Sequence, residues 1–386
     1  MSFESVLDAA SNERYGRQLL VKDFGVKRQQ RLLNALVGAG GLGCPALLYL
    51  SGLGVGDIGI VDGDTVDASN LHRQVLHTNA SVGKLKVESA KEELERRNPL
   101  VKITTHAIYL NANNALSIME QYDVIVDASD NATTRYLIND VCVIAQKPLV
   151  SGSALGLEGQ VAVYNYKGSP CYRCCYPNPT PTAITGNCSD NGVLGVVPGI
   201  IGSMQAMEVV KVITGMGDTL NGFQLMYDAF DSSVRKYKLP PKRSDCAVCG
   251  SHPSILTALD SIAATTAIQC AQPLNTLPSN HIMTVQTLAE KLKDAPDNYT
   301  LLDVRQVVQY NICHLKHSIN IPLKLLSSQV QLLSSNKPIY VICRRGVDSV
   351  DATQLLLQKT TNTMVWHVEG GLAAWSKQID STFPMY

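Results

Sequence analysis

The sequence predicts an α/β protein with two domains, and three observations support this fold class. A glycine-rich turn follows a short apolar run near the start of the chain, and an aspartate ends the next apolar run. Branched apolar runs then alternate with helical patterns, which implies a parallel sheet with right-handed crossovers. A second series of this kind begins near Ile282, after an Ala/Thr/Ser/Pro-rich stretch. We therefore expect a first domain at 1–250, a linker at 251–280 and a smaller α/β domain at 281–386.

The overall composition is that of a globular protein and excludes several classes. At 386 residues the chain is long for a single domain. Lys plus Arg and Asp plus Glu are balanced at 33 each, so we expect no direct nucleic-acid partner and no membrane partner. No apolar run reaches the roughly 20 residues that cross a bilayer. The N-terminus has no secretory pattern, so the 11 cysteines indicate metal ligands, reactive thiols and core residues in a cytosolic protein.

The glycine-rich turn predicts a nucleotide site. The glycines that follow the apolar run at 35–37 are Gly38, Gly40, Gly41 and Gly43. A helical segment and a second apolar run come next, and Asp62 ends that run. In such a G-x-G-x-x-G turn, backbone amides approach a phosphate at a helix N-terminus, and the acid is placed for a ribose hydroxyl. A glycine turn without a ligand is the alternative, and the motif alone leaves the nucleotide unidentified.

The other elements of the first domain follow from hydrophobic patterns. A polar, Arg-rich segment at 12–33 leads into the first strand, and Asn98-Pro99 ends the helix that begins near Gly83. The expected elements are strands at 35–37, 58–61, 101–105, 123–127 and 148–151, helices at 83–97 and 132–146, an exposed strand at 159–166, a core helix at 198–213 and antiparallel strands at 223–239.

Three charged residues distinguish between kinds of nucleotide. Arg73, Lys86 and Asp130 are spaced along successive strand–helix segments. A dehydrogenase has no need of them, whereas a nucleotidyl-transfer site needs cations and a metal-binding carboxylate because charge develops on phosphate oxygens. Each of the three taken alone is more often a solvated surface charge. Together with the glycine turn, they predict ATP as a substrate.

Residues 12–250 closely resemble the MoeB/ThiF family, the E1-like enzymes that adenylate the C-terminus of ubiquitin-like proteins. The motifs that carry the resemblance are N-E-R-Y-x-R-Q, G-A-G-G-L-G, D-x-D-x-V-x-x-S-N-L-x-R-Q, G-x-x-K-V, D-A-S-D-N, E-G-Q, C-Y-R-C and C-x-V-C-G. They cover the region almost continuously. The resemblance implies a Rossmann-like E1/ThiF domain with an antiparallel extension that a zinc ion clamps.

The resemblance also implies roles for individual residues. Asp62 is expected to bind ribose, Arg73 and Lys86 to hold the triphosphate, and Asp130 to bind Mg²⁺. Arg14 matches an arginine that the family's homodimers deliver into the partner's ATP site, which implies a homodimer. The other residues expected to bind ATP are the four glycines of the turn with Asp64, Ser69, Asn70, Leu71, His72 and Asn131.

Two C-x-x-C pairs predict a metal site. Cys171, Cys174, Cys246 and Cys249 supply four thiolates, which suits tetrahedral zinc, and their long separation is compatible with clamping distant strands. The alternative is four unrelated core thiols. The resemblance implies a structural zinc at these positions, and Cys175, beside the second ligand, is interpreted as a bystander.

Cys188 lies in a Pro/Thr-rich loop and is the first candidate nucleophile. A lone loop cysteine is more often inert, because nucleophilicity requires a lowered thiol pKa. Its position nevertheless matches the loop cysteine of E1-like sulfur-transfer enzymes, which attacks the acylated substrate. The resemblance therefore implies a catalytic role for Cys188.

The segment at 281–386 resembles a rhodanese domain. The matching marks are L-L-D-V-R, H-x-x-x-S-I-N-I-P, Y-V-I-C-R-R-G and E-G-G-L-x-A-W. Cys343 ends a predicted buried strand and opens a short loop before a helix, where backbone amides can stabilise a thiolate or persulfide. Cysteine phosphatases share this arrangement, but they need an arginine where this chain has Asp348. The generic rhodanese pattern C-R-x-G-x-R also has an arginine at that position, whereas the arginines of this chain, Arg344 and Arg345, directly follow the cysteine. A carboxylate at 348 disfavours phosphate and anionic thiosulfate alike, so the departure weakens the phosphatase interpretation and suggests another protein's persulfide as the sulfur donor.

Together, the two resemblances imply an adenylyltransferase and sulfurtransferase that uses ATP, Mg²⁺ and Zn²⁺. The expected substrates are ubiquitin-like sulfur carriers ending in Gly-Gly, namely the small subunit of molybdopterin synthase and a ubiquitin-related modifier. The expected donor is a persulfide-carrying cysteine desulfurase. The thiocarboxylated carriers would serve molybdenum cofactor biosynthesis and 2-thiolation of the tRNA wobble uridine. Two alternatives remain: a ligase that only conjugates the carrier to target lysines, and a non-catalytic scaffold that binds NAD or another nucleotide.

Overall fold

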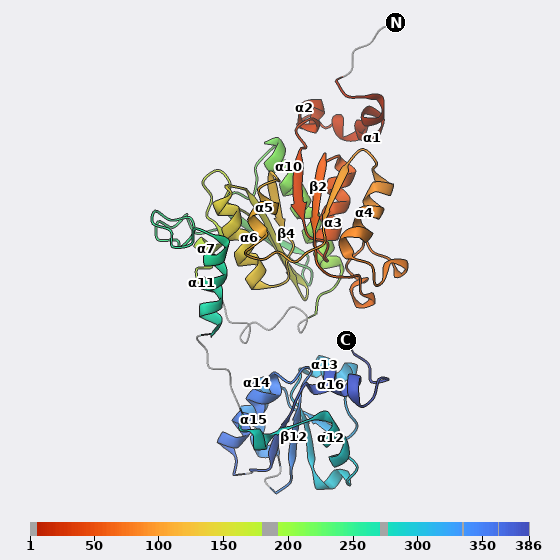
Figure 1. Ribbon diagram of the computed structural model, residues 1–386, viewed down its shortest axis with the longest axis vertical. Coiled ribbons are helices and arrows are strands. Elements are labelled where there is room, and N and C mark those ends of the chain that lie inside the picture. Colours follow the sequence, from red (N-terminus) through yellow and green to blue (C-terminus); the bar gives the residue numbers. More distant parts are fainter. Residues whose placement is uncertain (1–5, 180–191, 271–276, 334–335, 362, 386) are drawn as a thin grey trace. The chain divides into compact units, whose positions relative to one another are not determined.

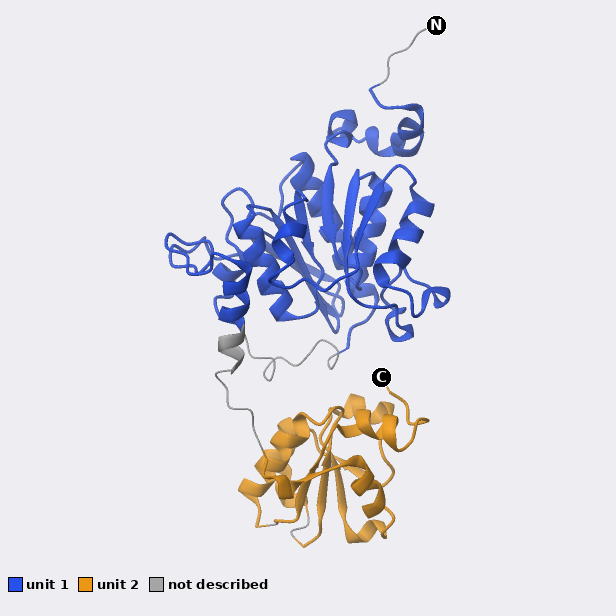
Figure 2. Ribbon diagram, in the orientation of Figure 1, with its two compact units in different colours: residues 1–272 blue, residues 273–386 orange. Residues whose placement is uncertain are grey.

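The computed structural model describes residues 6–179, 192–270, 277–333, 336–361 and 363–385 (Figure 1). Over these residues the chain divides into two compact units, 1–272 and 273–386, and each has its own β-sheet (Figure 2). Both sheets are built mainly from parallel strands with helices between them. The predicted α/β class is confirmed.

The first unit is built on a sheet that, in the part of the chain described, has eight strands in the order β3-β2-β1-β4-β5-β6-β7-β8. The parallel strands are β1 (Asn34–Val37), β2 (Asp57–Val61), β3 (Lys102–His106), β4 (Val124–Asp127) and β5 (Leu149–Leu155). The antiparallel extension consists of β6 (Glu158–Tyr164), β7 (Phe223–Asp228) and β8 (Ser233–Lys238). Each of these strands overlaps one that the hydrophobic patterns predict.

Helices cover both faces of this sheet (Figure 1). One face carries α3 (Gly43–Leu53), α4 (Lys86–Arg97) and α10 (Val196–Thr214). The other carries α5 (Ala115–Met119), α6 (Ala132–Ile144) and α11 (Ala258–Cys270). In β1, Ala35 and Val37 belong to the first core and Leu36 to the second, because successive side chains of a strand point to opposite faces. Two short helices precede the sheet: α1 (Ala9–Leu19) and α2 (Gly25–Gln29).

Helix α10 is the predicted core helix. Among the described helices it alone is long and apolar enough to cross a membrane, but more than half of it is buried within the unit. Val197, Ile201 and Val209 are fully buried, and a side chain at Gly202 would overlap the Leu42 carbonyl oxygen just before α3. This close approach of α10 to α3 identifies it as a packing helix of the core.

The stretch predicted as a linker contains helix α11, so that expectation is wrong for 258–270. The helix packs against α6, and Ser261 Oγ donates a hydrogen bond of 2.6 Å to the buried carboxylate of Asp140. Thr265 lies on the same buried side and accepts a hydrogen bond from the guanidinium of Arg173. The Ala/Thr/Ser-rich helix has no strong apolar face, and polar contacts supply much of its anchoring instead.

The second unit has, within the described residues, a five-stranded parallel sheet in the order β11-β10-β12-β13-β9. Its strands are β9 (Ile282–Met283), β10 (Thr300–Asp303), β11 (Ser318–Asn320), β12 (Ile339–Ile342) and β13 (Val365–Val368). Its α-helices are α12 (Val285–Lys291), α13 (Val307–Ile312), α14 (Leu323–Gln329), α15 (Asp348–Lys359) and α16 (Gly371–Gln378). Arg305 and Asp303, both about 1% exposed, form an ion pair of 2.6 Å that fixes the turn after β10.

Candidate active sites and metal centre

The glycine turn lies where the order of the sheet reverses. β1 is flanked by β2 on one side and β4 on the other, so the loops after β1 and β4 meet at the carboxyl edge, the usual ligand position in such sheets. A Cβ at Gly40 would lie 3.9 Å from the Ala128 carbonyl oxygen after β4. A side chain at Gly43 would overlap the Gly38 carbonyl oxygen, so α3 can begin there only with glycine.

Beyond β2, two carboxylates hold a buried lysine. Lys86 Nζ lies 2.6 Å from Asp64 Oδ2 and 3.9 Å from Asp62 Oδ1, with only 6% of its side chain exposed. The Tyr109 hydroxyl donates to Asp64 Oδ1 at 2.5 Å. Burial raises the pKa of Asp62 against the attraction of Lys86, whereas at Asp64 the hydrogen bonds from Lys86 and Tyr109 outweigh burial and lower the pKa. The sequence analysis did not single out Tyr109.

The short helix η1 (Ala68–Asn70) places Arg73 against the glycine turn. Arg73 Nη2 donates to Asn70 Oδ1 at 2.6 Å, and Nη1 lies 2.7 Å from His72 Nε2. A Cβ at Gly41 would lie 3.2 Å from Arg73. Desolvation, with the neighbouring guanidinium, lowers the pKa of His72. The structure thus brings Arg73, Asn70 and His72 to one side of the turn.

Ser69 and Leu71 support this arrangement through the main chain. Ser69 donates from both its amide and its hydroxyl to Asp67 Oδ1, at 2.8 and 2.6 Å, so that Asp67 caps η1. Leu71 ends η1, with its amide bonded to the Ala68 carbonyl. Their contribution in this structure is to shape the loop, and direct ATP contacts from either residue stay a prediction.

Asp130 lies in the loop after β4, two residues beyond Ala128, which approaches the glycine turn. Its side chain is exposed, and the Mg²⁺ ligand role stays a prediction. Asn131 is the N-cap of α6 and accepts a hydrogen bond of 2.8 Å from the Thr134 amide, so its side-chain oxygen has a structural role.

The sequence analysis missed the pair that holds this loop. Asp127, fully buried, forms an ion pair of 2.8 Å with Arg135 and accepts a hydrogen bond of 2.7 Å from Ser151. Arg135 also donates to the carbonyls of Ser129 and Gly152. A cavity of about 130 Å³ opens beside Arg135. The signal was available in D-A-S-D-N, since an aspartate that ends a buried strand needs a cation.

Within one chain, Arg14 lies away from these residues. Its Nη1 donates at 2.9 Å to the carbonyl of Arg97, the last residue of α4, whereas Lys86 is the first residue of that helix. At a rise of 1.5 Å per residue, the ends of α4 are about 16 Å apart. Delivery of Arg14 by a second copy stays a prediction.

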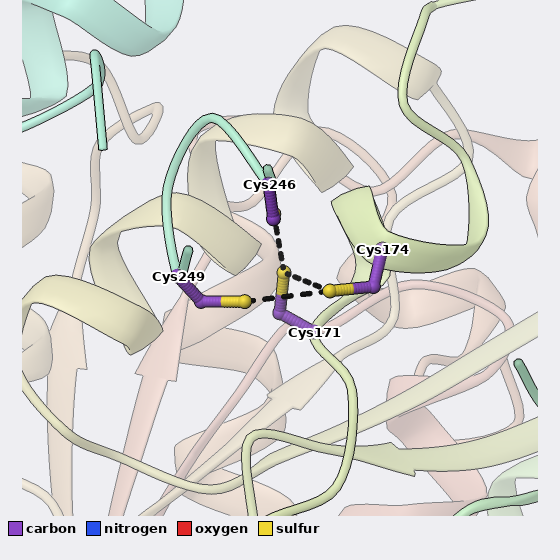
Figure 3. A group of neighbouring side chains, drawn as sticks. All are labelled: Cys171, Cys174, Cys246 and Cys249. Carbon is purple, nitrogen blue, oxygen red and sulfur yellow. Dashed lines mark hydrogen bonds between the residues drawn. The ribbon is translucent and has the colours of Figure 1, made fainter. Parts of the chain in front are cut away.

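The four predicted cysteines form one cluster in the first unit (Figure 3). Cys171 is the N-cap of α7 (Tyr172–Cys175) and Cys174 lies within that helix, whereas Cys246 and Cys249 come from the turn after β8. Their sulfur atoms all lie within 4.8 Å of one another, with Sγ–Sγ distances of 3.9, 3.6 and 3.4 Å for the pairs 171–174, 171–246 and 174–249. Zinc–sulfur bonds of about 2.3 Å in a tetrahedron place sulfurs about 3.8 Å apart. The cluster fits a zinc ion.

Of the two other cysteines predicted in this region, the structure describes Cys175 but not Cys188. Cys175 is half-buried beside the cluster and does not belong to the four, as the sequence analysis predicts. Cys188 lies outside the described residues, so its role remains a prediction from the sequence.

In the second unit, Cys343 occupies the predicted loop between β12 and α15. Its sulfur accepts a hydrogen bond from the Gly346 amide at 3.2 Å and lies 3.3 Å from Ser349 Oγ. Burial raises the pKa of the thiol, the hydrogen bond with Ser349 lowers it, and the Asp348 carboxylate raises it further. A side chain at Gly371 would overlap the Cys343 carbonyl oxygen, so the second glycine of E-G-G-L allows this segment to pack against the cysteine loop.

Comparisons with known proteins agree with this architecture. Residues 15–248 match the ThiF family and residues 284–378 a rhodanese-like domain. "Adenylyltransferase and sulfurtransferase MOCS3" of Aedes aegypti is 45% identical over 97% of this chain and 88% of its own length. The protein of the same name from Drosophila grimshawi is 46% identical over 97% and 86%. Escherichia coli MccB, solved with ATP, covers 63% of this chain and 75% of its own with a TM-score of 0.56 and 23% identity, a likeness of fold alone.

Proposed function

This chain belongs to the ThiF family and ends in a rhodanese-like domain, and from that premise we propose that it adenylates a carrier protein and then thiolates it. It is an adenylyltransferase and sulfurtransferase, the two activities named for relatives 43–46% identical over nearly the whole chain. The substrate is the C-terminal glycine of a ubiquitin-like carrier ending in Gly-Gly. The observation that carries the proposal is one chain with both a glycine turn that has Arg73 beside it and a buried cysteine whose sulfur accepts a hydrogen bond from the Gly346 amide.

The first step activates the carboxylate. A carboxylate oxygen of the carrier attacks the ATP α-phosphate, and the bond to pyrophosphate breaks, leaving an acyl-adenylate. Lys86 and Arg73 stabilise the charge that develops on the phosphate oxygens. Lys86 has two carboxylates within 4 Å, so the phosphates compete with Asp62 and Asp64 for its ammonium. Asp130 would hold a Mg²⁺ ion, whose charge favours pyrophosphate departure, and Arg14 would come from a second copy of the chain.

The second step transfers sulfur. Cys343 carries a persulfide, and its outer sulfur attacks the acyl carbon and displaces AMP, which gives an acyl disulfide. Cys188 then attacks the Cys343 sulfur of that disulfide and releases the thiocarboxylate, leaving a Cys188–Cys343 disulfide that a cellular thiol reduces. In the alternative order, Cys188 first forms a thioester with the carrier. Both orders end in the same product.

The proposed partners follow from this chemistry. The carriers are the small subunit of molybdopterin synthase and a ubiquitin-related modifier, and a cysteine desulfurase supplies the persulfide. The products serve molybdenum cofactor biosynthesis and tRNA 2-thiolation in the cytosol. The Asp348 carboxylate beside Cys343 supports a protein persulfide over an anionic donor such as thiosulfate.

The test is a reaction of purified chain, ATP, a Gly-Gly carrier and a persulfide donor, followed by the intact mass of the carrier. The expected product carries one sulfur in place of one oxygen. Cys343→Ala should abolish thiocarboxylate while ATP–pyrophosphate exchange continues, and Asp130→Ala should abolish exchange while Cys343 still takes up sulfur. AMP formed without any sulfur in the carrier would favour conjugation alone, and no AMP with either carrier would refute adenylation.

A further inference from the structure

We propose that Cys343, Ser349 and His367 form a proton relay that removes the thiol proton from Cys343 when it takes up sulfur. The inference rests on the sulfur-carrying role proposed for Cys343. Cys343 Sγ lies 3.3 Å from Ser349 Oγ, and the same oxygen lies 2.9 Å from His367 Nδ1. Sulfur, hydroxyl and imidazole are therefore joined by consecutive hydrogen bonds.

The burial of all three residues explains why a relay is needed. Cys343 is 1% exposed, Ser349 fully buried and His367 5% exposed. Desolvation raises the pKa of the thiol, which leaves it protonated near neutral pH, whereas the species that attacks sulfur is the thiolate. A neighbouring group that accepts the proton is one way to activate such a nucleophile.

His367 has the properties of that acceptor. Desolvation lowers its pKa, so the imidazole is neutral at pH 7, although Glu369 acts in the opposite direction. Both contacts allow either direction, and in the proposed relay the Cys343 thiol donates to Ser349 Oγ while the Ser349 hydroxyl donates to Nδ1. This direction requires Nδ1 to be the unprotonated ring nitrogen. The Gly346 amide donates to the sulfur at 3.2 Å and stabilises the thiolate once the proton has left.

The fold fixes this geometry through three elements. Cys343 directly follows β12, Ser349 lies in the first turn of α15, and His367 lies on β13 opposite Val341 of β12. A Cβ at Gly346 would lie 3.4 Å from His367 Cε1, so the imidazole ring packs against the cysteine loop. His367 acts on Cys343 only through Ser349 and is a positioning residue in that sense.

Other ionisable groups surround the relay. The charged and titratable residues on the loop and the elements packed against β13 are Arg344, Arg345, Asp348, Asp351, Lys359, Tyr340, His281 and Glu369. Of these, Glu369 acts on His367 and Asp348 on Cys343. Asp348 raises the pKa of the Cys343 thiol, and Glu369 raises the pKa of the His367 imidazole. Neither effect favours the thiolate directly, so the thiol still needs a proton acceptor.

The proposed step balances with a persulfide donor, R–S–SH. The Cys343 sulfur bonds to the outer sulfur of the donor, the donor's S–S bond breaks, and its inner sulfur leaves as a thiolate. The Cys343 proton passes to Ser349 Oγ, whose own proton passes to His367 Nδ1, and the leaving thiolate takes its proton from solvent. Cys343 is oxidised to a persulfide and the donor is reduced to a thiol, so no other oxidant is required.

The test measures the initial rate at which Cys343 of the full chain gains sulfur from glutathione persulfide, read on the peptide that contains Cys343. The wild-type rate should change little from about pH 7 to 8.5, because His367 stays neutral over that range. Ser349→Ala and His367→Gln should be at least about tenfold slower at pH 7, and their rates should rise about tenfold per pH unit as thiolate forms unaided. Ser349→Thr, which keeps a hydroxyl, should restore the flat profile.

The controls separate the relay from folding and from the proposed function. Ser328→Ala on α14 and His314→Gln, both at exposed positions, should keep the wild-type profile. Flat profiles for Ser349→Ala and His367→Gln, with rates lowered equally at every pH, would overturn the relay. If wild-type Cys343 gains no sulfur at any pH, either from glutathione persulfide or from a persulfide-carrying cysteine desulfurase, the proposed function itself fails.

Discussion

Lys86 Nζ lies 2.6 Å from Asp64 Oδ2, and the other oxygen of that carboxylate accepts a hydrogen bond from Tyr109. The lysine side chain is 6% exposed, whereas that of Asp64 is 49% exposed. The buried ammonium is therefore held by an anion that solvent can reach. A phosphate that enters takes the place of a carboxylate as the anionic partner of Lys86. Because the ammonium is already buried, phosphate binding requires little further desolvation of it.

Substitution of Lys86 tests this arrangement. Lys86→Gln should lower the rate of ATP–pyrophosphate exchange by on the order of 10²–10³, the usual loss for one group that stabilises developing charge. Lys84→Gln is the matched control, because Lys84 is half exposed and pairs with Glu92. Equal rates for Lys86→Gln and wild type would contradict the assignment of Lys86 to the triphosphate.

The glycine turn predicts opposite effects for two substitutions in α3. Gly43→Ala should destabilise the first unit by about 1–3 kcal/mol and weaken ATP binding, because the new methyl group overlaps the Gly38 carbonyl oxygen. Gly52→Ala has open space around its Cβ and should stabilise the helix by about 0.5–1 kcal/mol. Chemical denaturation measures both, and equal stabilities for the two variants would argue against a close contact at Gly43.

Metal content tests the cysteine cluster. Wild-type protein should contain one zinc per chain, and Cys174→Ser should lose it and unfold at a lower temperature. Cys175→Ser should keep both the metal and the stability, because Cys175 lies outside the four-cysteine group. Metal analysis and thermal unfolding of the two variants provide the comparison. Zinc loss from Cys175→Ser with retention in Cys174→Ser would reverse the assignment.

Buried histidines predict a dependence of stability on pH. Desolvation lowers the pKa of His77, which lies 3.0 Å from Ser89 Oγ, and that of His106. A folded-state pKa below the unfolded value of about 6.5 means that the unfolded chain binds protons first as the pH falls. Stability should therefore be unaffected by these groups above about pH 7 and should decline from there toward pH 5.

The His77→Gln variant tests this source of the decline. It should reduce the change in unfolding temperature between pH 7 and pH 5, because one of the groups that resist protonation is gone. His252→Gln, at an exposed position, is the matched control and should keep the wild-type slope. A slope that His77→Gln leaves unchanged would show that other groups cause the acid sensitivity.

Local patterns account for the parts of the protein that the sequence predicted. The glycine turn, Asp62 and the two C-x-x-C pairs each combine residue type with spacing, and the structure places them as expected. The position of Cys343 directly after a buried strand was predicted in the same way, because such a strand is visible in a few residues, and its sulfur-carrying role stays a prediction.

The features that were missed depend on partners that only the folded chain brings together. His367 meets Ser349 only because β13 pairs with β12, and no local pattern reports that pairing. For Asp127, D-A-S-D-N indicated that a cation is needed, but that Arg135 supplies it depends on which side of α6 faces the sheet. Helix α11 was taken for a linker because its contacts with Asp140 span more than a hundred residues.

Helix α11 determines where the chain can be truncated without disturbing the first unit. Asp140 is fully buried and receives hydrogen bonds from Arg173, between two zinc-ligand candidates, and from Ser261 on α11. A shortened chain that stops at Gly250 would strip one partner from this carboxylate and leave the guanidinium of Arg173 without Thr265. In such a fragment, the ion pair of Asp140 and Arg173 would be exposed to water where α11 is missing. A fragment that contains the adenylating unit alone should therefore extend beyond Cys270, so that it includes all of α11. Assays of that unit should use fragments with the same end point.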